Sequence, residues 1–274
     1  MKSIAFGQYY PAKSILHRLD PRIKILITVL YIVSTFLCKN ILSFALLLVS
    51  ALLLVIIGRV PMKTVLGSLR SVLFVLAFSA MLNVFWTKGE GDPLFSKWII
   101  TVYEDGIYNA VFIIVRIVSL IIGTSMLLTF TTTPIALTDA IEDLLSPLKK
   151  LGLPVHEFAM MMTIALRFIP TLIEETDKIM TAQKARGADF TSGNLVQRAK
   201  ALIPVLIPLF VSAFNRAADL ATAMECRCYH GGEGRTRMNV RHIRFVDILG
   251  LVVFVIFGAS LVALNILGIG YSMV

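Results

Sequence analysis

Long apolar runs almost free of charge dominate this sequence and restrict the folds that it can adopt. Lipid cannot satisfy backbone polar groups, so a chain crosses a bilayer as a helix of roughly 20 mostly apolar residues. Five stretches meet or approach this length, and Arg116 is the one charge within them: residues 25–38, 41–58, 71–87, 107–130 and 248–267. The sequence therefore predicts an all-α fold, a polytopic membrane helical bundle of about five spans, with a short first span that needs flanking residues.

Composition agrees with this interpretation. Hydrophobic residues make up 57% of the 274 residues and charged residues 16%, whereas soluble domains have about 45–50% and about 25%. Residues 1–24 are polar and charged, which is not the pattern of a cleavable signal peptide. Cys226 and Cys228 are one residue apart, but no His or Cys cluster with ligand spacing accompanies them, so no metal site is predicted.

The basic residues indicate the orientation of the chain. The N-terminal segment carries five Lys or Arg residues before the first span, and the connection at 59–70 carries three. The connection at 88–105 instead has four acidic residues against two lysines. Because cytoplasmic loops are enriched in Lys and Arg, we expect a cytoplasmic N-terminus and an external 88–105 connection. The net charge of +9 is then explained by basic residues on the cytoplasmic face. The sequence has no basic motif interleaved with aromatic residues, so no nucleic-acid partner is predicted.

The segment between the fourth and last spans is too long for an ordinary loop. Thr133 and Pro134 predict a helix start, Gly152 and Pro154 predict its end, and two longer helices are expected over 156–185 and 195–224. Each of the longer helices is apolar first and polar later, so either can pass for a short span, and six or seven spans remain possible. Charges within or beside the apolar halves, such as Arg167 and Arg216, favour helices lying at the inner membrane surface.

The chain accordingly divides into three predicted regions. Residues 1–130 form a transmembrane region of four spans, residues 131–245 form cytoplasmic or inner-face helices, and residues 246–274 form a C-terminal transmembrane helix.

Both longer helices end in an arginine between two small residues: Ala185-Arg186-Gly187 and Cys226-Arg227-Cys228. Small neighbours let a guanidinium project into a groove, where its planar fork can pair with a carboxylate. A lone arginine at a helix C-terminus usually only compensates the helix dipole. Two in matching context, 41 residues apart, favour a paired docking device.

These two motifs resemble the signature of the transmembrane coupling subunit (EcfT type) of energy-coupling factor (ECF) transporters, an ABC importer class. The stretches 16–24 and 229–236 also resemble the family, so the resemblance covers nearly the whole chain. It implies long cytoplasmic coupling helices and a multi-pass protein of a prokaryotic plasma membrane. It also implies that two cytoplasmic ABC ATPase subunits bind the motifs at Ala185, Arg186, Gly187, Cys226, Arg227 and Cys228. A separate small membrane protein would capture the substrate, a vitamin or another micronutrient.

The sequence predicts no enzyme and no bound cofactor. A nucleotide-binding loop of the Gly-x-x-x-x-Gly-Lys-Ser/Thr type is absent from the sequence, so ATP would be handled by the partner subunits. The four histidines, His17, His156, His230 and His242, fall outside the five predicted spans, unlike the convergent groups of a membrane-embedded enzyme.

The sequence leaves two questions open. The alternative function is a permease with its own substrate path, but the predicted spans consist mostly of Leu, Ile and Val. Arg116 is a functional candidate as an intramembrane charge, although snorkelling or pairing with a neighbouring helix also explains it.

Overall fold

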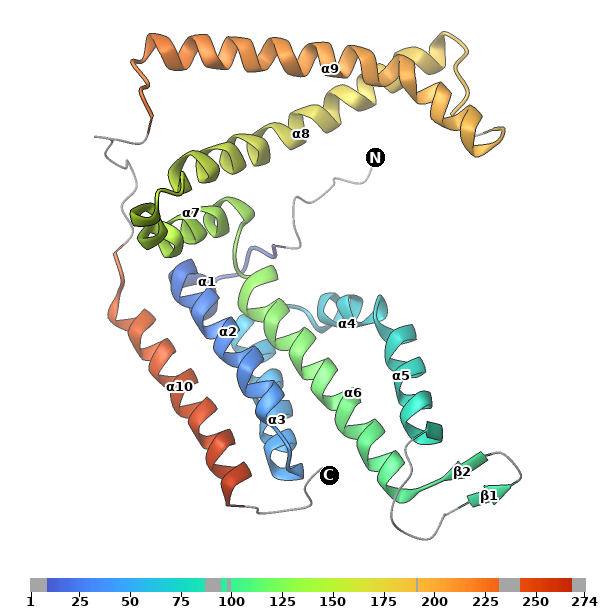
Figure 1. The fold of residues 1–274 in the computed structure, drawn as a ribbon, viewed down its shortest axis with the longest axis vertical. Coiled ribbons are helices and arrows are strands. Elements are labelled where there is room, and N and C mark those ends of the chain that lie inside the picture. The colour runs from blue at the N-terminus through green and yellow to red at the C-terminus, as the bar shows by residue number, and fades with distance from the viewer. Residues whose placement is uncertain (1–8, 87–94, 98–99, 191, 232–241, 268–274) are drawn as a thin grey trace. The chain divides into compact units, whose positions relative to one another are not determined.

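The structure is a computed structural model that describes residues 9–86, 95–97, 100–190, 192–231 and 242–267. It is predominantly helical, which confirms the predicted all-α class (Figure 1). The chain forms two compact units: unit 1 comprises Met1–Leu137 with Arg241–Val274, and unit 2 comprises Thr138–Val240.

Unit 1 is a bundle in which α6 contacts α2, α3 and α5, and α10 packs on α2 (Figure 1). Its core is apolar and centres on Ile27, Tyr31, Leu47 and Leu261, none of which is exposed. The described elements of this unit are α1 (Ile15–Arg18), α2 (Pro21–Leu37), α3 (Ile41–Gly58), α4 (Met62–Arg70), α5 (Leu73–Trp86), β1 (Phe95–Lys97), β2 (Ile100–Val102), α6 (Glu104–Thr124), the π-helix η1 (Ser125–Thr129) and α10 (Phe245–Ile266).

The predicted first and third spans differ in detail from the helices observed. The helix α2 begins at Pro21, earlier than the apolar run, because the Asp20 carboxylate accepts a hydrogen bond from Arg22 N and Pro21 occupies the first helical turn. The expected loop at 59–70 contains helix α4, which meets α5 at a bend of 59°. The antiparallel β1–β2 hairpin lies in the predicted external connection and was not expected.

Five of the described helices are long and apolar enough to cross a membrane, namely α3, α6 with η1, α8, most of α9, and α10; the bent α4–α5 pair makes a sixth if counted as one span. The number agrees with the expected five, but the members differ. Helix α2 has 17 residues, or about 26 Å at 1.5 Å per residue, slightly less than the hydrocarbon core. The helices over 155–185 and 196–226 pass by length and composition, so their position at the inner membrane surface stays a prediction.

Arg116 pairs with a neighbouring helix. Its Nη2 donates to the carbonyl of Cys38 at 2.8 Å, and its guanidinium lies 5.2 Å from the Phe44 ring centroid. Cys38 is the C-terminal capping residue of α2, so Arg116 satisfies a carbonyl that the helix leaves open. The structure therefore supports pairing with a neighbouring helix as the role of Arg116.

Buried polar groups fix the end of unit 1 at which α2 and α10 begin. Lys24 is 2% exposed, and its Nζ donates to the carbonyl of Thr131 at 2.9 Å and to the hydroxyls of Thr131 and Thr132. Asp247, equally buried, accepts hydrogen bonds from the backbone N–H groups of Asp20 and Arg244. The segment that leaves η1 is thus held against α2.

Unit 2 contains the helices expected after residue 131. Its elements are α7 (Pro134–Leu145), whose first turn belongs to unit 1, the 3₁₀-helix η2 (Ser146–Leu151), α8 (Val155–Ala185) and α9 (Leu195–Cys226). The predicted cap is confirmed, since the Thr133 hydroxyl accepts a hydrogen bond from Ala136 N. The α-helical part stops at Leu145 rather than near Gly152, because Pro147 lacks the N–H that would continue it.

We expect Lys24→Met to lower the melting temperature of the purified protein in detergent. The substitution keeps an unbranched side chain, one atom shorter, but leaves buried acceptors without this donor, which costs about 1–3 kcal/mol. Lys39→Met is the control, since residue 39 is exposed beyond the other end of α2. Equal melting temperatures for both variants would show that the Lys24 contacts do not stabilise unit 1.

Orientation can be tested by cysteine labelling in intact cells with a membrane-impermeant maleimide, in a chain whose native cysteines are replaced by serine because two of them are exposed thiols. Glu104→Cys at the start of α6 should be labelled from outside, and Lys63→Cys on α4 only after permeabilisation; both positions are exposed. The charge distribution of the connections is the reason for this expectation. The reverse pattern would invert the predicted topology.

Candidate functional site

The two arginine motifs occupy equivalent positions at the ends of α8 and α9. Arg186 is the C-cap residue of α8, and Arg227 is the C-cap residue of α9. Their backbone angles are nearly the same, with φ of −86° and −94°. All six predicted site residues are exposed: Ala185, Arg186, Gly187, Cys226, Arg227 and Cys228.

Both helix ends are closed by the same pair of backbone hydrogen bonds. At α8, Ala188 N donates to Gln183 O at 3.0 Å and Gly187 N donates to Lys184 O at 3.0 Å. At α9, Tyr229 N donates to Met224 O at 3.1 Å and Cys228 N donates to Glu225 O at 2.8 Å. This double closure is the Schellman motif, which satisfies carbonyls that a helix C-terminus leaves open. The backbone at each end is thereby set, and each arginine side chain extends from a defined turn.

The residue after each arginine adopts a left-handed conformation. Gly187 has φ of 88° and Cys228 has φ of 56°. Glycine reaches this region without a Cβ clash, whereas other L-residues are strained there. The sequence interpretation noted small neighbours around each arginine but missed this shared closure; a glycine directly after a long helix was the available signal at α8, and α9 has no such signal.

The two motifs are held apart. Helices α8 and α9 form an antiparallel pair: Gln183 Nε2 donates to the carbonyl of Pro204, and Glu175 contacts Ser212 further along. Contacts from the end of α8 therefore fall on the beginning of α9, and Arg186 and Arg227 lie at opposite ends of the pair, as the two long helices of Figure 1 show.

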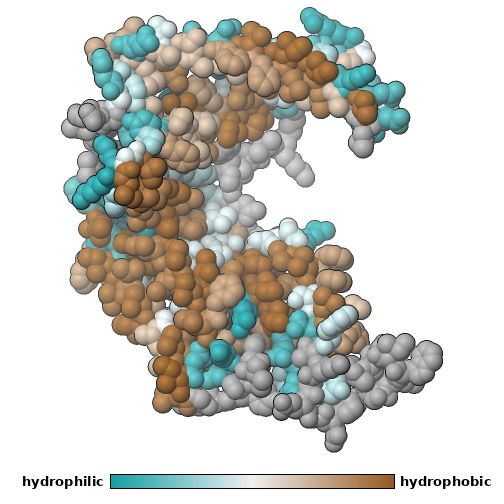
Figure 2. Space-filling view, in the orientation of Figure 1, coloured by the Kyte–Doolittle hydropathy of each residue, from teal (hydrophilic) through white to brown (hydrophobic). Residues whose placement is uncertain are grey.

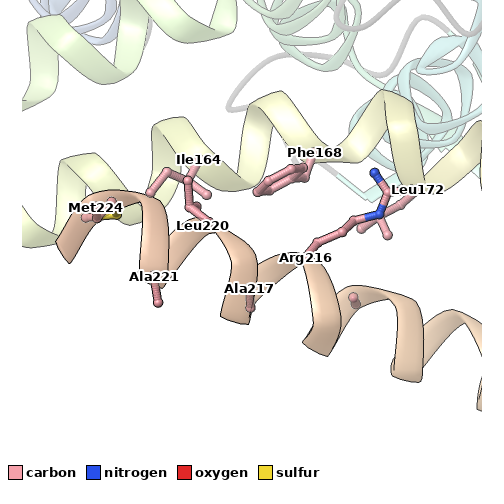
Figure 3. A pocket seen from close by; sticks show the side chains of 9 residues that line it. Ile164, Phe168, Leu172, Arg216, Ala217, Leu220, Ala221 and Met224 are labelled. Atoms are coloured by element: carbon pink, nitrogen blue, oxygen red, sulfur yellow. The ribbon is translucent and has the colours of Figure 1, made fainter. Parts of the chain in front are cut away.

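A groove of about 260 Å³ runs between α8 and α9 near the Arg227 end. Its walls are almost entirely apolar, with Ile164 and Phe168 of α8 facing Leu220 of α9 (Figure 3). The complete lining is Ile164, Phe168, Leu172, Ala213, Arg216, Ala217, Leu220, Ala221 and Met224.

Helix α9 also carries large apolar side chains that are exposed in the described part of the chain. Figure 2 shows apolar side chains gathered along this helix. The exposed ones are Val196, Leu202, Ile203, Leu206, Ile207, Phe210, Val211 and Phe214. On α8, Met161 and Met162 are exposed as well. Exposed apolar patches of this kind mark membrane or protein contacts, and methionine is suited to partners of varied shape.

Among the described residues, no His, Cys, Asp or Glu side chains gather in a group of three or more that could hold a metal ion. Cys226 and Cys228 are free thiols at the surface. The site is thus defined by two guanidinium groups at fixed helix ends and by the apolar faces between them.

This combination defines a helical integral membrane protein with two matched arginine-bearing helix ends. Comparison with known sequences agrees, because residues 12–238 match the family model described as CbiQ, cobalt transport protein. The chain belongs to the family of energy-coupling factor transporter transmembrane proteins, EcfT.

The relatives align over most of their length. The EcfT protein of Clostridium kluyveri is 52% identical over 238 residues, which cover 87% of this chain and 88% of the relative. That of Thermosediminibacter oceani is 47% identical over 273 residues, covering 100% of this chain and 98% of the relative. That of Bacillus subtilis is 51% identical over 237 residues, covering 86% and 89%. The chain is therefore a membrane subunit of an ECF transporter.

Substitutions at the two left-handed positions should have opposite effects. We expect Gly187→Ala to destabilise the end of α8 by roughly 1 kcal/mol, and Cys228→Gly to stabilise the end of α9 by a similar amount. Hydrogen exchange of the backbone amides in the last turn of each helix measures both. Changes of the same sign would show that backbone strain does not govern these ends.

Proposed function

We propose that this chain is the coupling subunit of an ECF-type importer and that Arg186 and Arg227 each bind one cytoplasmic ATPase subunit. The observation that carries the proposal is the repeated geometry: two exposed arginines at the C-caps of two helices with identical backbone closure. A shared local structure fits a shared kind of binding groove, as two homologous ATPases would supply.

The separation of the two motifs supports two partners rather than one. Glu175 and Arg216 touch at the middle of the α8–α9 pair, and each lies eleven residues before the arginine of its own helix. Eleven residues of helix span about 16 Å, so the two arginines lie about 30 Å apart along an antiparallel pair. One small acidic groove cannot bind both guanidinium groups at that distance.

A separate membrane protein is proposed to capture the substrate, a vitamin or another micronutrient. The exposed apolar faces of α8 and α9 are suited to such a partner, because they give area without fixed polar contacts. The core of unit 1 is packed with apolar side chains, which favours this division of labour over a permease with its own substrate path.

In this proposal the chain hydrolyses nothing itself and holds no cofactor, since ATP binds to the partner subunits. Its N-terminus and the α8–α9 pair face the cytoplasm of a prokaryotic cell, where the ATPases are. The basic residues of the cytoplasmic connections support this orientation.

We expect Arg186→Ala and Arg227→Ala each to weaken ATPase co-purification, and the double variant to abolish it. Each guanidinium would meet a carboxylate that is left buried and unpaired when the arginine is truncated. Because an ammonium cannot reproduce the bidentate fork, Arg186→Lys should also be impaired. The measurements are ATPase recovery with the tagged chain and uptake of a mixture of labelled vitamins by cells.

Arg70→Ala is the matched control, because Arg70 is an exposed arginine in the last turn of α4, a helix of unit 1 outside the α8–α9 pair. It should leave both measurements unchanged. Normal assembly and uptake in the double variant would refute the docking assignment and leave the two arginines as compensation of the helix dipoles.

A further inference from the structure

A closed polar cluster joins α8 and α9 between the two arginine motifs. Arg216 Nη2 of α9 donates to Glu175 Oε2 of α8 at 2.8 Å. The hydroxyl of Ser212, one turn earlier on α9, donates to the other carboxylate oxygen of Glu175. Arg216 Nε in turn donates to the Ser212 hydroxyl at 3.4 Å. Both carboxylate oxygens of Glu175 are thus bound by groups of the opposite helix.

The groove beside this cluster is apolar. Arg216 lines the groove between the helices together with Phe168, Leu172 and small residues such as Ala213 and Ala217 (Figure 3). Apolar contacts are non-directional, and the short side chains of alanines interlock too little to stop one helix from sliding along the other. A hydrogen-bonded ion pair, by contrast, has a narrow range of distances and angles. The cluster is therefore the contact that sets how α8 lies against α9 at this point.

The position of the cluster follows a local symmetry. Arg186 and Arg227 are 41 residues apart in sequence, and Glu175 and Arg216 are also 41 residues apart. An antiparallel helix pair whose ends match in this way has an approximate two-fold axis between its helices. That axis relates one arginine motif to the other, and it passes beside the contact of Glu175 with Arg216. The ion pair is therefore equally far from both motifs along the helices.

We propose that Glu175, Ser212 and Arg216 are positioning residues at the pivot of the α8–α9 pair, required to convert movement of the two arginine motifs into transport. This inference rests on the proposed function, because it takes the motifs as the points where ATPases act. With the pivot intact, displacement of one helix end turns α8 and α9 against each other about a fixed point. Without it, the apolar contacts and the hydrogen bond from Gln183 to the Pro204 carbonyl near one end leave the crossing point unfixed, and the displacement is lost.

The contribution of the cluster to stability does not account for its placement. In Glu175 and Arg216 the side chains are 22% and 39% exposed, and ion pairs with such access to solvent add little to folding stability. A pivot needs defined geometry rather than a large energy, and the bonding of both carboxylate oxygens supplies it.

The test compares ATP hydrolysis with uptake in the complete transporter, purified from the native cell through a tag on this chain and reconstituted in liposomes. Glu175→Gln keeps the size of the side chain and an oxygen for Ser212, and Arg216→Glu reverses the partner's charge. For both variants we expect normal ATPase co-purification and ATP hydrolysis. Uptake of a labelled vitamin mixture per ATP hydrolysed should fall at least about fivefold, the lower range of usual coupling energies.

The exchanged pair Glu175→Arg/Arg216→Glu serves as the rescue, because it restores opposite charges at the same two positions. It should recover uptake per ATP relative to Arg216→Glu alone, which a merely structural loss would not do. Glu174→Gln is the control: Glu174 is an exposed neighbour on α8, and its variant should match the wild type.

A wild-type ratio of uptake to ATP hydrolysis in both Glu175→Gln and Arg216→Glu overturns the proposal. Loss of ATPase co-purification in these variants also overturns it, since the cluster would then serve assembly. The proposed docking function fails separately, through normal assembly of the Arg186→Ala/Arg227→Ala variant, so the two failures are distinguishable.

Discussion

Helix ends carry most of the specific chemistry of this protein, because a membrane environment forces the backbone into helices whose interiors have no free hydrogen-bonding groups. Arg116 caps the end of α2, and Asp247 accepts N–H groups where α2 and α10 begin. Arg186 and Arg227 stand at the ends of α8 and α9. Each of these charges lies where the backbone offers an unpaired group or a dipole, and the apolar helix surfaces remain free for lipid or partners.

Charged side chains that bind polar groups within the chain differ from those that extend into solvent. Lys24 and Asp247 are each 2% exposed and bound by backbone or hydroxyl groups of neighbouring segments. The side chains of Arg186 and Arg227 are exposed, and their turns are already closed by backbone hydrogen bonds. An arginine that its own helix end does not need is available to a partner, which is the physical basis of the docking proposal.

Hydrophobic periodicity and capping signals made the helices more predictable from the sequence than the contacts between them. The start of α7 at Thr133 and Pro134 followed from capping rules, and the ends of α8 and α9 fell within two residues of expectation. The 59° bend between α4 and α5 and the 3₁₀ continuation after Leu145 were missed, because a single apolar run or helical period does not report where the axis turns. The ion pair of Glu175 with Arg216 was also missed, since these residues are 41 positions apart in sequence and meet only through the register of α8 against α9.

That register connects the site to the pivot. If α9 shifted by one turn along α8, Arg216 would meet a different side chain and the two arginine motifs would no longer be equally distant from a common contact. The identical closures at Gly187 and Cys228 would then set each end correctly but not the relation between the ends. In the proposed function, two ATPases acting in concert would require both: local turns that present each arginine alike, and a fixed crossing that places the two turns symmetrically. We propose that the polar cluster between α8 and α9 meets the second requirement, beside a groove lined by interchangeable apolar side chains.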